Sequence, residues 1–240
     1  MEDILVPNEA VKYILFQRTS HQRFPKTFIY RVLSRYLPSW IYNQVVTIEA
    51  KANPSNIKKL YENDMNKDYQ SIKDSLPKIC SSILDIGCGV AGIDILLSKH
   101  YKDKQPKIYL LDKTKIESSV FYGFETRATF YNSLDIAKVM LIRNGIPESC
   151  VHLVEATDAN EINIDCYVDL VISVQSWGFH YPVETYLEKV YDVLIEGGSL
   201  IIDVRKGTNG IQILNNVLGK VDIIVDEKKF HRVLASKRQH

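Results

Sequence analysis

A buried-strand pattern that runs straight into a glycine-rich turn, and then into a helical pattern, constrains this chain more than any other feature. Residues 82–86 form the strand pattern, and a helical pattern follows from residue 93 to residue 99. Gly87 and Gly89 lie in the turn, where a residue without Cβ permits positive φ angles and a close approach of a ligand to the backbone. A glycine turn at the carboxyl end of a strand predicts an α/β fold with a nucleotide-type site.

The acid before the glycines indicates which ligand the turn binds. The glycine pattern alone fits a dinucleotide-binding fold equally well, but Asp85 precedes Gly87 by two residues. A carboxylate there suits a ligand with a positive group better than a pyrophosphate, which it would repel. The run from Asp85 to Gly89 closely resembles motif I of the class I S-adenosylmethionine-dependent methyltransferases. The third glycine of that family falls at Ala91 here, with Gly92 next to it.

The resemblance implies a full set of contacts to S-adenosylmethionine. The acid and the glycine turn would hold the methionine end, and Cys88 is interpreted as a small packing residue, not a nucleophile. Asp112, at the end of a second strand, would accept both ribose hydroxyls, although it also suits a helix N-cap. Asp158, after a third strand at 151–156, would contact the adenine amino group or be a plain loop acid. The expected cofactor-binding residues are Asp85, Gly87, Cys88, Gly89, Gly92, Asp112, Lys113, Asp158, Ser173 and Gln175.

The order of elements after residue 160 supports the same fold. Strand patterns at 167–173 and 199–204 flank a helical pattern at 183–194, and a second helical pattern follows at 211–218. The last two strands, 221–225 and 231–236, are separated by only five residues, so they must pair antiparallel. We therefore expect an α/β Rossmann-like three-layer sandwich. Its seven-stranded, mostly parallel sheet ends in an antiparallel C-terminal hairpin, and an N-terminal helical extension precedes it.

Catalysis is expected in the segment that follows the fourth strand, residues 175–182. Methyl transfer is an in-line displacement at an already activated carbon, so the protein mainly positions the acceptor and manages its proton. His180 is the natural base, with Tyr181 as the second catalytic candidate. Trp177 or Tyr181 is a candidate neighbour of the cationic sulfur. The alternative is that Trp177, Phe179 and His180 simply pack beneath the N-terminal helices.

Residues 1–75 differ from the rest, so two domains are expected: a helical cap or substrate region at 1–75 and a catalytic domain at 76–240. Apolar residues recur at helical spacing at 8–18 and 28–37. Residues 1–60 also contain nine Lys and Arg but only four Asp and Glu, so this region has a net positive charge. These basic residues either form a solvated surface or bind an anionic substrate. The candidates for binding such a substrate are Arg18, His21, Arg23, Arg31 and Arg35. The long connection at 113–131 is a second segment that could cover the active site. Its aromatic residues either fold over the cofactor or fill a small separate core.

Composition narrows the function further. The net charge of +1 and the absence of an Asn/Asp-Pro-Pro-aromatic motif disfavour a nucleic-acid substrate. Four cysteines without metal spacing indicate a reducing compartment, and no leader or membrane span is expected, which predicts a cytoplasmic protein. No metal cluster is expected, and a homodimer stays open. The prediction is O-methylation of a small or sugar-like acceptor. N-methylation, a nicotinamide-dependent oxidoreductase and a non-catalytic cofactor-binding partner subunit are the alternatives.

Overall fold

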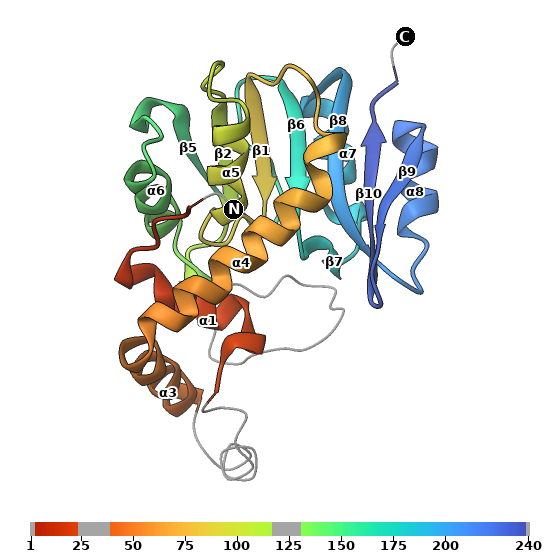
Figure 1. The fold of residues 1–240 in the computed structure, drawn as a ribbon. Coiled ribbons are helices and arrows are strands. Elements are labelled where there is room, and N and C mark those ends of the chain that lie inside the picture. The colour runs from red at the N-terminus through yellow and green to blue at the C-terminus, as the bar shows by residue number, and fades with distance from the viewer. Residues whose placement is uncertain (1–2, 24–38, 117–130, 239–240) are drawn as a thin grey trace.

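A seven-stranded sheet forms the centre of the protein (Figure 1). The computed structural model describes residues 3–23, 39–116 and 131–238. The strand order is β5-β2-β1-β6-β8-β10-β9, in which β10 alone is antiparallel to both of its neighbours. The strands of this sheet are β1 (Ser82–Ile86), β2 (Lys107–Asp112), β5 (Val151–Glu155), β6 (Val168–Ser173), β8 (Leu194–Arg205), β9 (Val221–Asp226) and β10 (Phe230–Ser236).

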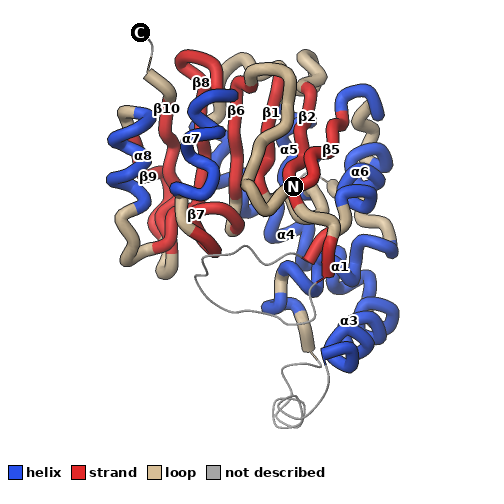
Figure 2. The backbone as a smooth tube through the Cα atoms, turned by 180° about the vertical axis from the view of Figure 1, so that it is seen from behind, coloured by secondary structure: helices blue, strands red, loops and turns tan. Residues whose placement is uncertain are grey.

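Helices cover both faces of the sheet. On one face lie α4 (Pro54–Ile72), α5 (Gly92–His100) and α6 (Leu134–Arg143), and on the other lie α7 (Glu184–Val193) and α8 (Gly210–Leu218), as Figures 1 and 2 show from opposite sides. The helices α1 (Val11–Gln17) and α3 (Ser39–Ala52) lie near the edge where the parallel strands end. Short 3₁₀ turns occur at Asn8–Ala10, Thr19–His21, Lys73–Ser75 and Glu148–Cys150.

Successive side chains of a strand point to opposite faces of the sheet, so the apolar side chains form two cores, one on each face. In β1, Ile83 joins the core under α4, α5 and α6, whereas Leu84 and Ile86 join the core under α7 and α8. The N-terminal helices belong to the first core, because Val11 and Ile14 of α1 are fully buried in it. The first helical segment therefore buries the apolar face that its spacing predicts, against α3 and α4. The division of the chain at residue 76 stays a prediction.

The predicted fold class is confirmed. The C-terminal hairpin is antiparallel, with β10 between β8 and β9, so the sheet is the mostly parallel one that was expected. Two details differ. The strand β8 begins at Leu194, five residues before the strand pattern at 199–204. Residues 175–182, expected as a connection, contain the short strand β7 (Ser176–Tyr181).

Two expected features lie outside the described residues. They are the second N-terminal helix at 28–37 and most of the aromatic connection at 113–131, of which residues 117–130 are not described. The ends of that connection pair with one another, as β3 (Lys115–Ile116) and β4 (Tyr131–Asn132). None of the helices in the described residues is both long enough and apolar enough to cross a membrane.

Candidate functional site

The glycine turn lies between β1 and α5, at the edge where the parallel strands end (Figure 1). Gly87 and Gly89 have φ angles of +76° and +56°, which is the left-handed region that glycine tolerates. Ala91 takes φ 59° and ψ 34° immediately before α5. This is the position where the family has its third glycine, so the chain keeps the left-handed backbone there even with an alanine.

Side chains from three separate elements lie directly on this turn. A Cβ atom built on Gly87 would be 1.8 Å from the Ser176 Oγ of β7, and one on Gly89 would be 2.7 Å from the Gln17 Oε1 of α1. On Gly92 it would be 2.2 Å from the hydroxyl oxygen of Tyr61 in α4. The turn is therefore covered by β7 and by the N-terminal helices, and its glycines leave room for those side chains.

Asp112 connects the end of β2 to the glycine turn. Its Oδ2 accepts a hydrogen bond from the Gly89 N–H at 2.9 Å, and its Oδ1 accepts one from the Lys113 N–H at 2.7 Å. Burial raises the pKa of this carboxyl to about 6, although those hydrogen bonds oppose the shift. The chain continues into β3, so Asp112 does not cap a helix.

Asn132, which the sequence did not single out, joins the N-terminal region to this site. Its side-chain N–H groups donate to the Gly89 carbonyl and, at 3.1 Å, to the Asp112 Oδ2. Its Oδ1 accepts a hydrogen bond from the Gln17 Nε2 at 3.2 Å. The only signal for Asn132 in the sequence is its place at the end of a long connection, just before a helix.

Asp85 lies beside a second buried acid, Asp94, in the first turn of α5. Asp85 is 2% exposed and Asp94 is 0% exposed, and neither carboxylate oxygen of Asp94 has a hydrogen-bond partner among the described residues. Burial raises the pKa of Asp85 well above its ordinary value, and the charge of Asp94 raises it further. Sequence reasoning did not find Asp94, because an acid in the first turn of a helix is ordinary.

The remaining expected cofactor contacts differ in their surroundings. Lys113 forms an ion pair with Asp158 at 2.9 Å, and Asp158 is almost fully exposed. Ser173 is fully buried, donates to the Ile86 carbonyl at 2.7 Å and accepts from the Trp177 N–H at 3.0 Å. Its hydroxyl is thus already used to anchor β7 to β6 and β1. Gln175 adopts a left-handed φ of 54° in the turn between β6 and β7.

The two catalytic candidates lie in contrasting environments on β7. His180 is exposed and its ring packs edge-on against Phe179, with centroids 4.8 Å apart. Tyr181 is buried and hydrogen-bonded to Ser176, and burial, reinforced by the charges of Asp112 and Asp85, raises the pKa of its hydroxyl. The structure therefore brings Tyr181 toward the glycine turn.

Trp177 has the packing role that the sequence left open, but against a different partner. It is fully buried, its Nε1–H donates to the Val183 carbonyl at 2.9 Å, and its ring packs edge-on against Tyr186 of α7. These contacts belong to the core on the α7 side of the sheet. Of the two alternatives, packing holds for Trp177, but its partners are Val183 and Tyr186 and not the N-terminal helices.

Two of the N-terminal basic candidates, Arg18 and His21, bind acids of the same region. Arg18 forms ion pairs with Asp64 at 3.2 Å and Asp68 at 3.4 Å, and His21 contacts Asp64 at 2.9 Å. Burial opposes ionisation of Asp64, but the hydrogen bond from His21 and the charge of Arg18 hold its pKa below the ordinary value. Arg31 and Arg35 lie outside the described residues.

A buried ion cluster links α4, β8 and β10 beneath β7. Arg232 contacts both oxygens of Asp203, at 2.6 and 2.9 Å, and reaches Asp68 at 3.1 Å. Asp203 also accepts the Gln175 N–H at 3.0 Å. Asp203 therefore has an internal role that holds the turn before β7.

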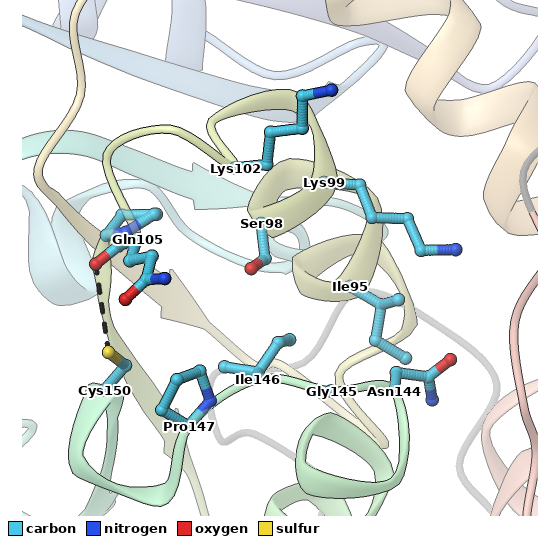
Figure 3. A pocket seen from close by; sticks show the side chains of 11 residues that line it. Ile95, Ser98, Lys99, Lys102, Gln105, Asn144, Gly145, Ile146, Pro147 and Cys150 are labelled. Carbon is cyan, nitrogen blue, oxygen red and sulfur yellow. Dashed lines mark hydrogen bonds between the residues drawn. The ribbon is translucent and has the colours of Figure 1, made fainter.

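The open cavity in Figure 3 is not part of this site. It has a volume of about 240 Å³ and is lined by Ile95, Ser98 and Lys99 of α5, by residues 144–147, and by the connection into β2. That connection precedes β2, whereas the glycine turn follows β1, so the cavity lies at the opposite edge of the sheet. Ligands of open α/β sheets bind at the carboxyl edge.

Comparison with solved structures identifies the fold. A candidate O-methyltransferase from Nostoc punctiforme is similar with a TM-score of 0.52 and 17% identity, over 73% of this chain and 56% of that one. The T. thermophilus 16S rRNA N2 G1207 methyltransferase, in complex with AdoMet and guanosine, is similar with a TM-score of 0.50 and 10% identity, over 70% of this chain and 41% of that one. The match thus spans about half the length of these relatives. No family model and no curated protein matches the sequence.

These likenesses, the strand order and the glycine turn define the class. The chain has the Rossmann-like fold of the class I S-adenosylmethionine-dependent methyltransferases. At these identities the likeness concerns the fold, and the two relatives are described with different acceptors.

Proposed function

We propose that this protein is an S-adenosylmethionine-dependent methyltransferase. The observation that carries the proposal is the convergence of Asp85, the Gly87–Gly89 turn and Asp112 at the carboxyl edge of a sheet with the methyltransferase strand order. A dinucleotide dehydrogenase does not end its sheet in an antiparallel hairpin, so the observed β8-β10-β9 order opposes the oxidoreductase alternative.

The residues present fit the cofactor chemically. Asp85 and Asp112 are buried carboxylates, and neither forms an ion pair with a cation within the described part of the chain. A cationic amino group beside Asp85 would supply a positive charge there. A ribose hydroxyl would donate to the lone pair that remains on the Asp112 Oδ1. When bound, the cofactor supplies a methyl group activated by a positively charged sulfur.

For the acceptor, we propose an oxygen of a small or sugar-like molecule, with His180 as the base. The imidazole of His180 is exposed on β7, and Ser176 at the start of the same strand lies against Gly87. A histidine accepts a proton near neutral pH, as removal of a hydroxyl proton requires. Tyr181 keeps its proton because its pKa is raised, so its role is to donate a hydrogen bond and position the acceptor.

The first experiment is a calorimetric titration with S-adenosylmethionine, S-adenosylhomocysteine and NAD. Wild-type protein should bind the two sulfur compounds and ignore NAD. Asp112→Asn should weaken binding about 10- to 100-fold, because a hydrogen bond to a charged group contributes about 1.5–3 kcal/mol. Asp103→Asn, in the exposed turn after α5, is the control and should bind as the wild type does. Binding of NAD alone would overturn the proposal.

The second experiment is an acceptor screen with the wild type, His180→Ala and Tyr181→Phe. We expect methyl transfer to a hydroxyl compound that falls about 100-fold or more in His180→Ala while cofactor affinity is unchanged. Full turnover in His180→Ala would refute the assignment of the base. Transfer only to amines would replace O-methylation by N-methylation and leave the methyltransferase assignment intact.

A further inference from the structure

Asn132 is buried where three other segments of the chain meet. It is 2% exposed and belongs to β4, whereas Gly89 follows β1, Asp112 ends β2 and Gln17 ends α1. The helix α1 also packs directly against β4. The side-chain amide of Asn132 forms hydrogen bonds with all three residues, so both of its ends are used within the described part of the chain.

The neighbours of this amide fix which way round it lies. Its Nδ2 faces the Gly89 carbonyl and, at 3.1 Å, the Asp112 Oδ2, and a carbonyl or carboxylate oxygen only accepts. With the amide turned over, its own oxygen would face these two acceptors. On the other side, the Gln17 Nε2 donates to the Asn132 Oδ1 at 3.2 Å. Gln17 therefore reinforces the orientation in which Asn132 donates to Asp112.

This orientation determines which oxygen of Asp112 is left for a ligand. Its Oδ2 accepts the Gly89 N–H at 2.9 Å as well as the Asn132 amide, so both lone pairs of that oxygen are used. Among the described residues, its Oδ1 accepts the Lys113 N–H, at 2.7 Å, and keeps one lone pair. These hydrogen bonds also favour the charged carboxylate against burial, which raises its pKa to about 6. Asn132 thus helps to hold a charged carboxylate with one lone pair open at Oδ1.

We propose that Asn132 is a positioning residue for cofactor binding, which turns Asp112 so that its Oδ1 accepts one hydroxyl of the cofactor ribose. Gln17 holds the Asn132 amide in the orientation that this contact requires, so the N-terminal helix α1 contributes to the affinity for the cofactor. The inference rests on the proposed function and adds to it two residues that act through Asp112.

Removing the Asn132 donor should weaken one particular contact with the ligand. Asn132→Leu keeps nearly the same shape without a polar group, and it should weaken binding of S-adenosylhomocysteine about 10-fold or more. The comparison ligands are the 2′-deoxy and 3′-deoxy forms of that compound, each without one ribose hydroxyl. In the wild type one of them should bind about 10- to 100-fold more weakly than the parent compound, and in Asn132→Leu this hydroxyl ratio should fall to about threefold or less. An Asn132 with a structural role alone would weaken all three ligands equally and leave the ratio unchanged.

Two substitutions of Gln17 test its part separately. Gln17→Glu places a carboxylate against the Asn132 Oδ1, so the amide should turn over, donate to that carboxylate and present its oxygen to Asp112. Binding of S-adenosylhomocysteine should weaken about 10-fold. Gln17→Met removes the donor without repelling the amide, so binding should weaken about threefold or less. Equal losses in the two variants would show that Gln17 only fills space and would overturn its role.

The measurement is calorimetric titration of the full chain with the three ligands. Asn216→Leu and Gln212→Glu, at two exposed positions of α8, are the matched controls and should bind as the wild type does. An unchanged hydroxyl ratio in Asn132→Leu, or no loss for either deoxy form in the wild type, would overturn the inference and leave the proposed function standing. No binding of S-adenosylhomocysteine to the wild type would overturn both. If Asn132→Leu does not fold, the same hydroxyl ratio measured in Gln17→Glu decides the question.

Discussion

Replacing Arg232 by methionine should cost this protein a large part of its stability. Arg232 is 2% exposed and lies against Asp203, which is fully buried, and Asp68. Methionine fills a similar volume but leaves Asp203 without its cation. Removing one partner of a buried ion pair costs about 3–5 kcal/mol, because the remaining charge stays buried and uncompensated. In a chain of this length that loss lowers Tm by about 6–20 °C.

The measurement is thermal and urea unfolding of Arg232→Met beside two comparison variants. Arg143→Met is the surface control, because Arg143 is 54% exposed and pairs with an exposed glutamate, so it should lose less than about 1 kcal/mol. The double variant Arg232→Met/Asp203→Asn should recover part of the loss, because an amide carries no charge and still accepts the Gln175 N–H. A loss of under about 1 kcal/mol in Arg232→Met, or no recovery in the double variant, would refute the reasoning.

The loss in Arg232→Met should also depend on pH. Burial raises the pKa of Asp203 even with Arg232 present, and removal of the guanidinium raises it further. A folded-state pKa above the unfolded value means that stability is lost as the pH rises through the folded pKa. The deficit should therefore shrink as the pH falls from about 8 to about 5. A deficit that grows on acidification would contradict this sign.

Three further predictions concern the site and its surroundings. Gly92→Ala should destabilise the protein by about 1–3 kcal/mol in urea unfolding, because the new Cβ would lie 2.2 Å from the Tyr61 hydroxyl. An unchanged free energy of unfolding would show that α4 can shift to make room for the methyl group. Asp94→Asn should raise the Tm of the ligand-free protein at about pH 8 but not at about pH 4. Burial raises the pKa of Asp94 to about 6 in the folded protein, so the wild type loses stability as the pH rises through that value. The same change in Tm at both pH values would argue against a destabilising charge on the buried Asp94. Trp177→Phe should cost about 1–3 kcal/mol, since the Val183 carbonyl loses its donor, and should leave the affinity for S-adenosylhomocysteine unchanged; a large loss of affinity would return Trp177 to the binding site.

Local patterns were enough to predict the sheet and the glycine turn. A buried strand, a tight turn and an amphipathic helix each depend on residues within about ten positions, so their signals survive in the sequence. The antiparallel hairpin at the C-terminus also follows from a local fact, the short connection before residue 231. For the same reason Asp85 and Asp112 could be found, because each lies at the end of a strand pattern.

Polar partners that come from distant segments could not be predicted. Asn132 lies 43 residues from Gly89 and 115 from Gln17, and Arg232 reaches Asp68 across 164 residues. Nothing in an arginine on a strand or an asparagine before a helix indicates which group it will meet. For His180 the sequence indicates a place beside the site, because the residue follows the fourth strand. It does not show to which side of β7 the imidazole points.

The sequence by itself determined the order of elements, the mostly parallel sheet and the acid–glycine turn, because these depend on backbone preferences and apolar spacing within short segments. Only the tertiary structure decided that α1, α4 and β7 cover that turn, that Asp94 is buried beside Asp85, and that Asp203 pairs internally with Arg232. The physical reason is burial. The charge state and partners of a carboxylate depend on which groups exclude water from it, and those groups are brought together by packing from all parts of the chain.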